Sequence, residues 1–211
     1  MAPKDEHPED CSKAPRFSVS RRDFLKTAGI SSLAAGVAGV AEAEEQTPGA
    51  RAAGPGEVPV QLMVNGKRLD LRIEPRVTLL DAIRDRGDMT GVKRVCDRGA
   101  CGACTMIVDG RTVYSCSTLA IDVQGKQIRT VEGLASGPTL HPVQQAFCDQ
   151  DALMCGFCTP GFIMASVALY EKHPNATVDQ IKKGLDGNVC RCGTFTRILE
   201  ANLKVRGVAR A

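Results

Sequence analysis

The chain has 211 residues, a formal net charge of +3 from 27 basic and 24 acidic side chains, and no tryptophan. This length allows one or two domains. The nearly neutral charge argues neither for nor against nucleic acid, but the lack of a basic run and the few aromatic residues argue against a nucleic-acid-binding protein. No apolar run reaches the roughly 18 residues of a membrane-spanning helix, so we expect no integral membrane segment, and ten cysteines direct attention to sulfur chemistry.

The first 43 residues have the pattern of an export signal rather than of a folded domain. A polar stretch ends in Arg21 and Arg22, an Ala- and Gly-rich run follows from Thr27 to Val40, and Ala41-Glu42-Ala43 is a small-residue cleavage site. The paired arginines followed by Phe-Leu-Lys are similar to the bacterial twin-arginine signal, which a receptor reads. We therefore expect residues 1–43 to be a twin-arginine signal peptide, cleaved after Ala43, that directs a folded protein to the periplasm. The alternative is an amphipathic or disordered tail with two chance arginines.

A linker and a first hairpin follow the signal. Residues 44–57 are rich in Glu, Pro, Gly and Ala and have too little apolar surface to offset the entropy of ordering them. From Val58 to Ile73 apolar residues alternate with polar ones on both sides of Asn65-Gly66. Because Asn-Gly supplies the positive φ angles of a tight turn, this pattern predicts a β-hairpin.

The rest of the first half predicts a short helix and three more strands. Thr78 is the expected cap of a helix that ends at Arg86. A second hairpin is predicted over residues 105–116, with Asp109-Gly110 at its turn, and a last strand covers residues 127–131. Two hairpins around one helix are the outline of a β-grasp domain, which we expect to span residues 58–133.

The second half of the chain changes to a helical period. Helices are predicted over residues 142–148, 160–172, 178–186 and 195–205. Pro142 and Pro160 suit the first turn of a helix, and Thr177 stands three residues before Gln180 as a capping box. We therefore expect residues 134–211 to form a four-helix bundle, so that the whole chain has an α+β fold.

Four cysteines around the second hairpin have a spacing with chemical meaning, Cys96-x4-Cys101-x2-Cys104-x11-Cys116. Small residues between them, such as Gly99, let backbone amides turn toward the sulfurs without a side-chain clash. The order C-x4-C-x2-C…C is that of plant-type [2Fe–2S] proteins, in which four thiolates surround two irons. The spacing therefore favours an iron–sulfur cluster.

Disulfides and zinc are the competing interpretations of this first set. Sulfurs two and four residues apart in one tight loop strain the geometry of a disulfide. Structural zinc sites use paired Cys-x2-Cys hairpins or histidine partners, and His7, His141 and His173 lie far from the loop in sequence. A zinc-stabilised interaction module stays open as an alternative that metal analysis would separate from a cluster.

A second set of four cysteines, Cys155-x2-Cys158-x31-Cys190-x-Cys192, lies in the helical half. A lone Cys-x2-Cys is a weak pattern that also fits a thioredoxin-like or zinc site. The Cys-Arg-Cys pair adds specificity, because two ligands one residue apart suit two sulfurs on one side of a small cluster. Each pair precedes a predicted helix start, whose positive end would stabilise a negatively charged cluster.

The stretches RVCDRGACGACTMIVDGRTVYSC, MCGFCTPGF and GNVCRCGTFTRI together resemble the small iron–sulfur subunit of the xanthine oxidase, or molybdenum hydroxylase, family. The resemblance extends from Val58 to the C-terminus, and the signal is similar to that of the periplasmic aldehyde oxidoreductase branch. It implies a plant-type ferredoxin-like β-grasp domain with an outer [2Fe–2S] cluster, followed by a helical domain with an inner [2Fe–2S] cluster. The implied ligands are Cys96, Cys101, Cys104 and Cys116 for the outer cluster, and Cys155, Cys158, Cys190 and Cys192 for the inner one.

The same resemblance implies the partners and the role. The inner cluster of such proteins lies beside the pterin of a molybdenum cofactor that a separate large subunit binds. Hydroxylation at molybdenum leaves two electrons there, and two clusters in series would pass them on singly to an FAD subunit or a cytochrome c. We therefore expect the electron-transfer subunit of a periplasmic aldehyde or N-heterocycle oxidoreductase, which is not catalytic alone. A free-standing ferredoxin-like carrier is the alternative.

Three positions outside the two cysteine sets carry further expectations. The family commonly has Gln just before the Cys-Gly-Phe-Cys motif, where an amide can reach the pterin, whereas this chain has Met154, whose sulfur is only a weak acceptor. We expect Cys148 to be a small buried side chain on the apolar face of its helix, together with Val143 and Phe147. Cys11 would leave with the signal peptide.

Overall fold

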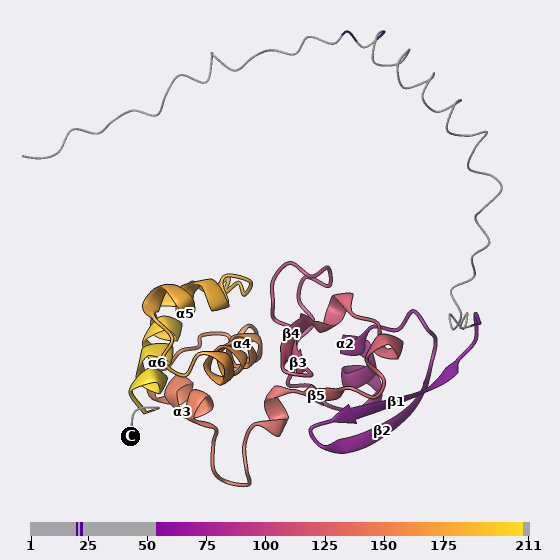
Figure 1. Cartoon of the computed structure of the whole chain (residues 1–211), viewed down its shortest axis with the longest axis horizontal. Coiled ribbons are helices and arrows are strands. Elements are labelled where there is room, and N and C mark those ends of the chain that lie inside the picture. Colours follow the sequence, from indigo (N-terminus) through magenta and orange to yellow (C-terminus); the bar gives the residue numbers. More distant parts are fainter. Residues whose placement is uncertain (1–19, 21, 23–53, 209–211) are drawn as a thin grey trace, which may run out of the picture. The chain divides into compact units, whose positions relative to one another are not determined.

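A computed structural model of the chain describes residues 20, 22 and 54–208, with side chains described as far as Arg206. The predicted signal peptide lies outside the described residues apart from Ser20 and Arg22, as do Cys11, His7 and most of the predicted linker. The described chain has a mixed α+β fold, with a five-stranded sheet built by residues before 130 and the longer helices after 141 (Figure 1). Among residues 20, 22 and 54–208, no helix is long and apolar enough to cross a membrane.

The strands form one sheet in the order β2-β1-β5-β3-β4. They are β1 (Val58–Val64), β2 (Lys67–Ile73), β3 (Thr105–Val108), β4 (Arg111–Tyr114) and β5 (Gln127–Arg129). Strands β1 and β5 are parallel, and the other neighbours are antiparallel. Both predicted hairpins are confirmed, because Asn65 and Gly66 turn with φ of 50° and 75°, and Asp109 and Gly110 with φ of 46° and 75°.

Two boundaries in the first half differ from the prediction, and the short helix keeps its predicted ends. The second hairpin ends at Tyr114, and a 3₁₀ turn over Ser115–Ser117 follows, so Cys116 lies in a turn and not in a strand. Strand β5 ends before Thr130, because the amide of Thr130 donates to the side chain of Asn65 (2.9 Å) instead of extending the sheet. The short helix α2 (Leu79–Asp81) is capped by Thr78 as predicted and continues as a π-helical turn over Ala82–Arg86.

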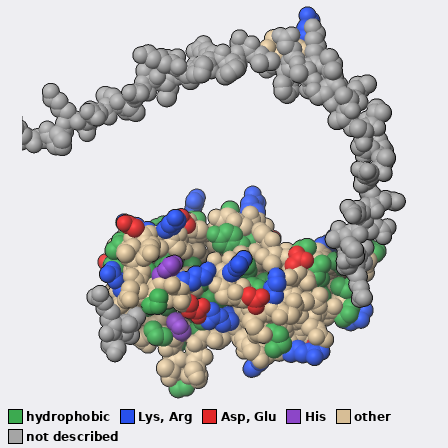
Figure 2. Space-filling model, viewed as in Figure 1, with side chains coloured by type: hydrophobic (Ala, Val, Ile, Leu, Met, Phe, Trp, Pro, Cys, Tyr) green, Lys and Arg blue, Asp and Glu red, His purple; other side chains and the backbone are tan. Residues whose placement is uncertain are grey.

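Four longer helices occupy the second half at the predicted places. They are α3 (Pro142–Asp149), α4 (Thr159–Lys172), α5 (Val178–Leu185) and α6 (Phe195–Val208). The predicted capping box of α5 is present, since the Thr177 hydroxyl accepts from the Gln180 amide and the Gln180 side chain accepts from the Thr177 amide. On the face in Figure 2, basic and acidic side chains are interspersed, so this face presents no field of a single sign.

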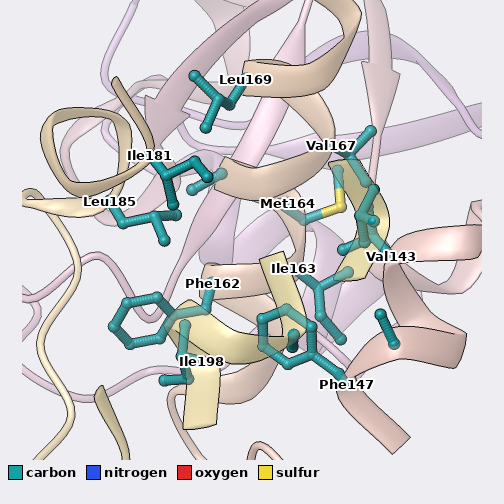
Figure 3. Close-up of a cluster of buried hydrophobic side chains, with 14 of the residues drawn as sticks. Val143, Phe147, Phe162, Ile163, Met164, Val167, Leu169, Ile181, Leu185 and Ile198 are labelled. Carbon is teal, nitrogen blue, oxygen red and sulfur yellow. The ribbon is translucent and has the colours of Figure 1, made fainter. Parts of the chain in front are cut away.

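Helix α4 joins the two halves of the chain. Every residue from Gly161 to Leu169 is buried, because this helix packs against α3 and α5 on one side and against β3 on another. Figure 3 shows the resulting core, in which Phe147 and Phe162 lie among aliphatic side chains from all four helices. Ile107 of β3 belongs to this helical core, whereas its neighbour Met106 faces the core of the sheet and α2. The strand is therefore covered on both faces, and the sheet and helices meet at β3.

Candidate metal centres

A strongly bent loop presents the first two cysteines of the outer set. Cys96 and Cys101 lie between the π-helical turn and β3, and the loop turns through residues with positive φ. These are Asp97 (56°), Gly99 (68°) and Gly102 (69°). Positive φ strains most side chains but not glycine, so Gly99 and Gly102 let the chain turn sharply between the cysteines.

The second hairpin brings the other two cysteines of the outer set together. Cys104 immediately precedes β3 and Cys116 follows β4, and the pairing of Thr105 with Tyr114 places both at the same end of the hairpin. The Ser115 hydroxyl donates to the carbonyl of Cys104 (2.8 Å), which holds the two strand ends together.

Backbone amides are directed at the sulfurs of the outer set, as the small residues in the loop predicted. The amide of Gly99 donates to Sγ of Cys116 (3.2 Å), and the amide of Ala100 donates to Sγ of Cys96 (3.4 Å). A Cβ atom on Gly99 would lie 2.7 Å from Oγ of Ser117, so a larger residue would push the loop away from the sulfur. Such amides stabilise thiolates, the form in which cysteine binds metal.

The inner set is built from the starts of two helices. Cys158 is the N-cap residue of α4, and Cys190 and Cys192 lie in the loop just before α6. The Cys190 thiol donates to the Thr194 hydroxyl (3.4 Å), and the Thr194 amide donates to Sγ of Cys190 (3.5 Å). The first turns of both helices therefore adjoin the cysteines, which places the positive ends of two helix dipoles near the sulfurs.

Within each set the thiols interact in pairs. The pairs are Cys96 with Cys101, Cys104 with Cys116, Cys155 with Cys192, and Cys158 with Cys190. In the part of the chain that the structure describes, no group of three or more His, Cys, Asp or Glu side chains is arranged to hold a metal ion. A [2Fe–2S] centre takes four cysteines around two irons, so two pairs in each set, with amides directed at their sulfurs, fit this group.

Hydrogen bonding and burial move the pKa values of the thiols in opposite directions. A hydrogen bond from the backbone of Arg98 lowers the pKa of Cys96 to about 7. Burial raises the pKa of Cys104 to about 11 and that of Cys158 to about 12. At neutral pH Cys104 and Cys158 therefore keep their protons until a metal displaces them, so loading of either set releases protons.

The surroundings of the inner set are open and apolar. Cys155 and Cys192 are exposed, whereas Cys104 and Cys116 of the outer set are buried. Large apolar side chains near the inner cysteines are also exposed: Leu153, Met154, Phe157, Val189 and Phe195. The side chain of Met154 is 73% exposed and borders, together with Cys192, a surface pocket of about 370 Å³.

The structure corrects one cysteine prediction and places two histidines away from the cysteine loops. Cys148 is exposed, although we expected it to be buried beside Phe147. Successive helical residues are about 100° apart around the axis, so the residue after Phe147 turns away from the core. His141 and His173 lie at helix ends, as the N-cap of α3 and the C-cap of α4.

Contacts between the two cysteine loops were not predicted from the sequence. The amide of Val189 donates to the carbonyl of Cys101 (2.9 Å), and the side-chain amide of Asn188 donates to the carbonyl of Gly102 (2.8 Å). The Tyr114 hydroxyl donates to the carbonyl of Gly187 (2.9 Å). The sequence offers only a Gly-Asn pair, separated from the Cys-Arg-Cys motif by Val189, and this pair does not indicate which residues it contacts.

Comparisons with known proteins match this chain to iron–sulfur protein families. Residues 69–155 match the family described as "2Fe-2S iron-sulfur cluster binding domain", and residues 130–203 match the "[2Fe-2S] binding domain" family. The chain is 39% identical to the aldehyde oxidoreductase iron-sulfur-binding subunit PaoA of Escherichia coli O157:H7, over 95% of this chain and 96% of that one. It is 44% identical to the nicotine 6-hydroxylase small subunit of Paenarthrobacter nicotinovorans, over 71% of this chain and 90% of that one.

A solved structure is similar in fold to this chain. A chain of quinoline 2-oxidoreductase from Pseudomonas putida 86 matches 73% of this chain and 96% of its own length, with a TM-score of 0.69 and 36% sequence identity. Sequence and structure thus lead to the same group of multisubunit oxidoreductases. The chain belongs to the family of small iron–sulfur subunits of the molybdenum hydroxylases, which transfer electrons through [2Fe–2S] clusters while a partner subunit holds the molybdenum cofactor.

Proposed function

We propose that Cys96, Cys101, Cys104 and Cys116 hold an outer [2Fe–2S] cluster, and that Cys155, Cys158, Cys190 and Cys192 hold an inner one. A [2Fe–2S] cluster gives and accepts one electron at a time, which divides the two electrons of a hydroxylation into single steps. The chain then connects the molybdenum subunit, at the inner site, with an electron acceptor at the outer site.

The observation that carries this proposal is the hydrogen bond from the amide of Val189 to the carbonyl of Cys101, 2.9 Å long. Val189 precedes Cys190 in the chain, so this bond and a few covalent bonds join a cysteine of the inner set to a cysteine of the outer set. Electron tunnelling weakens less along covalent and hydrogen bonds than across empty space. The bond therefore supports a relay between the two sites within this one chain.

The exposed apolar side chains around the inner set support a partner at that site. Contiguous apolar surface around a functional site is typical of a protein interface. Leu153, Met154, Phe157 and Phe195 stand within a few residues of the inner cysteines and are at least 41% exposed. We assign this surface to the molybdenum subunit, and the edge of the outer site near Cys96 to an FAD subunit or a cytochrome c.

We also propose the finer fold assignment. The sheet with its one short helix supports a β-grasp, plant-type ferredoxin-like domain over residues 58–133, and α3 to α6 support a helical [2Fe–2S] domain over residues 134–211. The shared strand β3 means that these two domains have a common boundary within the core.

Export to the periplasm by the twin-arginine route is a further part of the proposal. Alignment with the aldehyde oxidoreductase subunit covers 95% of the chain, against 71% for the nicotine hydroxylase subunit, so the first relative shares an N-terminal segment. The export of an already folded protein would let the clusters be inserted in the reducing cytoplasm, before the cysteines could form disulfides. The longer alignment with the aldehyde oxidoreductase subunit also favours an aldehyde as the substrate of the complex, with an N-heterocycle as the second candidate.

Metal analysis of the chain purified from its native host tests the central proposal. We expect a red-brown protein with about four irons per chain, accompanied by a molybdenum-containing subunit. A colourless protein with zinc would support the interaction module, and a red-brown monomer without a lasting partner would support a free-standing carrier.

For export, replacement of Arg21 and Arg22 by Lys should leave an assembled, iron-loaded complex in the cytoplasm. A signal for the unfolded-chain route should yield colourless, disulfide-bonded protein, and a red-brown active product would contradict the proposed reason for the twin-arginine route.

A further inference from the structure

Asn188 is a buried polar side chain at the point where the two cysteine loops meet. It is 6% exposed, and its side-chain amide donates to the carbonyl of Gly102 (2.8 Å) and lies 3.4 Å from Oγ1 of Thr105. Gly102 belongs to the outer loop, between Cys101 and Cys104, whereas Asn188 precedes Cys190 by two residues. An amide buried at this position would cost free energy without these partners, so its hydrogen bonds require the two loops to stay together.

The backbone around Asn188 is shaped for this contact. A Cβ atom on Gly102, where φ is +69°, would lie 2.6 Å from Nδ2 of Asn188. A Cβ atom on Gly161, at the start of α4, would lie 2.2 Å from the carbonyl oxygen of Gly102 and 3.1 Å from the same nitrogen. Two glycines from different segments thus make the space that the Asn188 side chain enters.

The carbonyl of Gly102 is already bonded within its own loop. It accepts from the amide (3.1 Å) and from the hydroxyl (2.6 Å) of Thr105. The bond from Asn188 therefore fastens the helical half of the chain to a carbonyl that is fixed relative to Cys101 and Cys104. Because Val189 follows Asn188, the same contact holds the amide of Val189 against the carbonyl of Cys101.

We propose that Asn188 is a positioning residue for electron transfer between the two clusters, which fixes their separation and preserves the hydrogen bond from Val189 to Cys101. This inference rests on the proposed function, since it requires both clusters. The chain offers a matched control in Tyr114, whose hydroxyl also bonds across the two halves, to the neighbouring residue Gly187.

The test measures the magnetic coupling between the two reduced clusters by electron paramagnetic resonance, in the intact complex, for Asn188→Ala, Asn188→Asp and Tyr114→Phe. We expect both Asn188 variants to keep the iron content and both cluster signals, to lose most of the splitting that each cluster causes in the other, and to reduce the outer cluster more slowly after a substrate pulse. Asp has the size of Asn, and its ionised carboxylate cannot donate, so this variant provides the test if Asn188→Ala does not load iron. Tyr114→Phe should keep the splitting.

Two results would overturn the proposal. One is an unchanged splitting in an Asn188 variant that holds both clusters. The other is an equal loss of splitting in Tyr114→Phe, which would mean that any contact between the halves has the same effect. A wild-type complex without two cluster signals would contradict the proposed function itself, and the two failures are therefore distinguishable.

Discussion

The two cysteine sites are built for different neighbours. The outer site is enclosed by this chain, because Cys104 and Cys116 are buried between a hairpin and a loop and amides of the same loop donate to the sulfurs. The inner site is more open, because Cys155 and Cys192 are exposed while only Cys190 is buried, and exposed apolar side chains lie within a few residues of these cysteines. The difference agrees with the proposed arrangement, in which this chain encloses the outer site and the molybdenum subunit would cover the inner site.

Removal of one cysteine ligand from each site should give the largest difference between the two sites. Cys192→Ser should abolish the reduction of both clusters by substrate, since electrons enter at the inner site. Cys104→Ser should still let substrate reduce the inner cluster, whereas turnover with the physiological acceptor is lost. Paramagnetic resonance after addition of substrate measures both signals, and equal loss of both in the Cys104 variant would contradict two sites in series.

A methyl group on Gly161 should damage the enclosed site. Its Cβ atom would meet the carbonyl oxygen of Gly102 at 2.2 Å, and neither backbone can move far inside the core. We expect Gly161→Ala to lower the free energy of unfolding by about 1–3 kcal/mol, as overpacked cores do. The control is Gly184→Ala in α5, where the Cβ atom meets only the flexible side chain of Leu169 at 3.1 Å. Thermal unfolding should show little or no loss for the control, and equal losses would refute the clash.

Protonation of His141 should lower the stability of the helical half at low pH. Burial lowers the pKa of His141, whose Nδ1 accepts from the amide of Val143 (3.2 Å) at the start of α3; Glu171 opposes this shift and Arg129 adds to it. Because the folded-state pKa is lowered, this stabilisation is complete above the ordinary pKa of about 6.5 and is lost as the pH falls below it. His141→Asn keeps a capping side chain that does not titrate.

Unfolding measurements between pH 7.5 and 5 should then separate the two proteins. We expect the wild type to lose up to about 1 kcal/mol relative to His141→Asn, the size of one helix cap. Parallel curves for the two proteins over this range would show that His141 does not carry the effect.

The smallest change in stability is expected from a substitution of Met154, near the inner site. Since the side chain of Met154 is 73% exposed, Met154→Gln buries no amide and should change the free energy of unfolding by no more than about 0.5 kcal/mol. Its effect should instead appear in the complex, as tighter retention of the molybdenum subunit in size-exclusion chromatography. A lower melting temperature without a gain in retention would show that Met154 packs against apolar surface.

Local sequence signals were enough to predict the hairpin turns, the start of α5 and the grouping of the cysteines. Asn65-Gly66 and Asp109-Gly110 specify their hairpins because positive φ is a property of the turn residues themselves, and Thr177 with Gln180 specifies the start of α5 within four residues. The spacing of the eight cysteines in the two sets, together with the family resemblance, predicted which thiols belong to each set. Signals of this kind act over a few residues, so no tertiary structure was needed to interpret them.

Contacts between distant residues were decided only by the tertiary structure. The exposure of Cys148 depends on the angle at which α3 packs, and the end of β5 depends on the side chain of Asn65, which is distant in sequence. The junction of Asn188 with Gly102 joins residues that are 86 positions apart. Composition and periodicity carry no information about such a pair, because the free energy of the contact exists only after α4 has packed against β3.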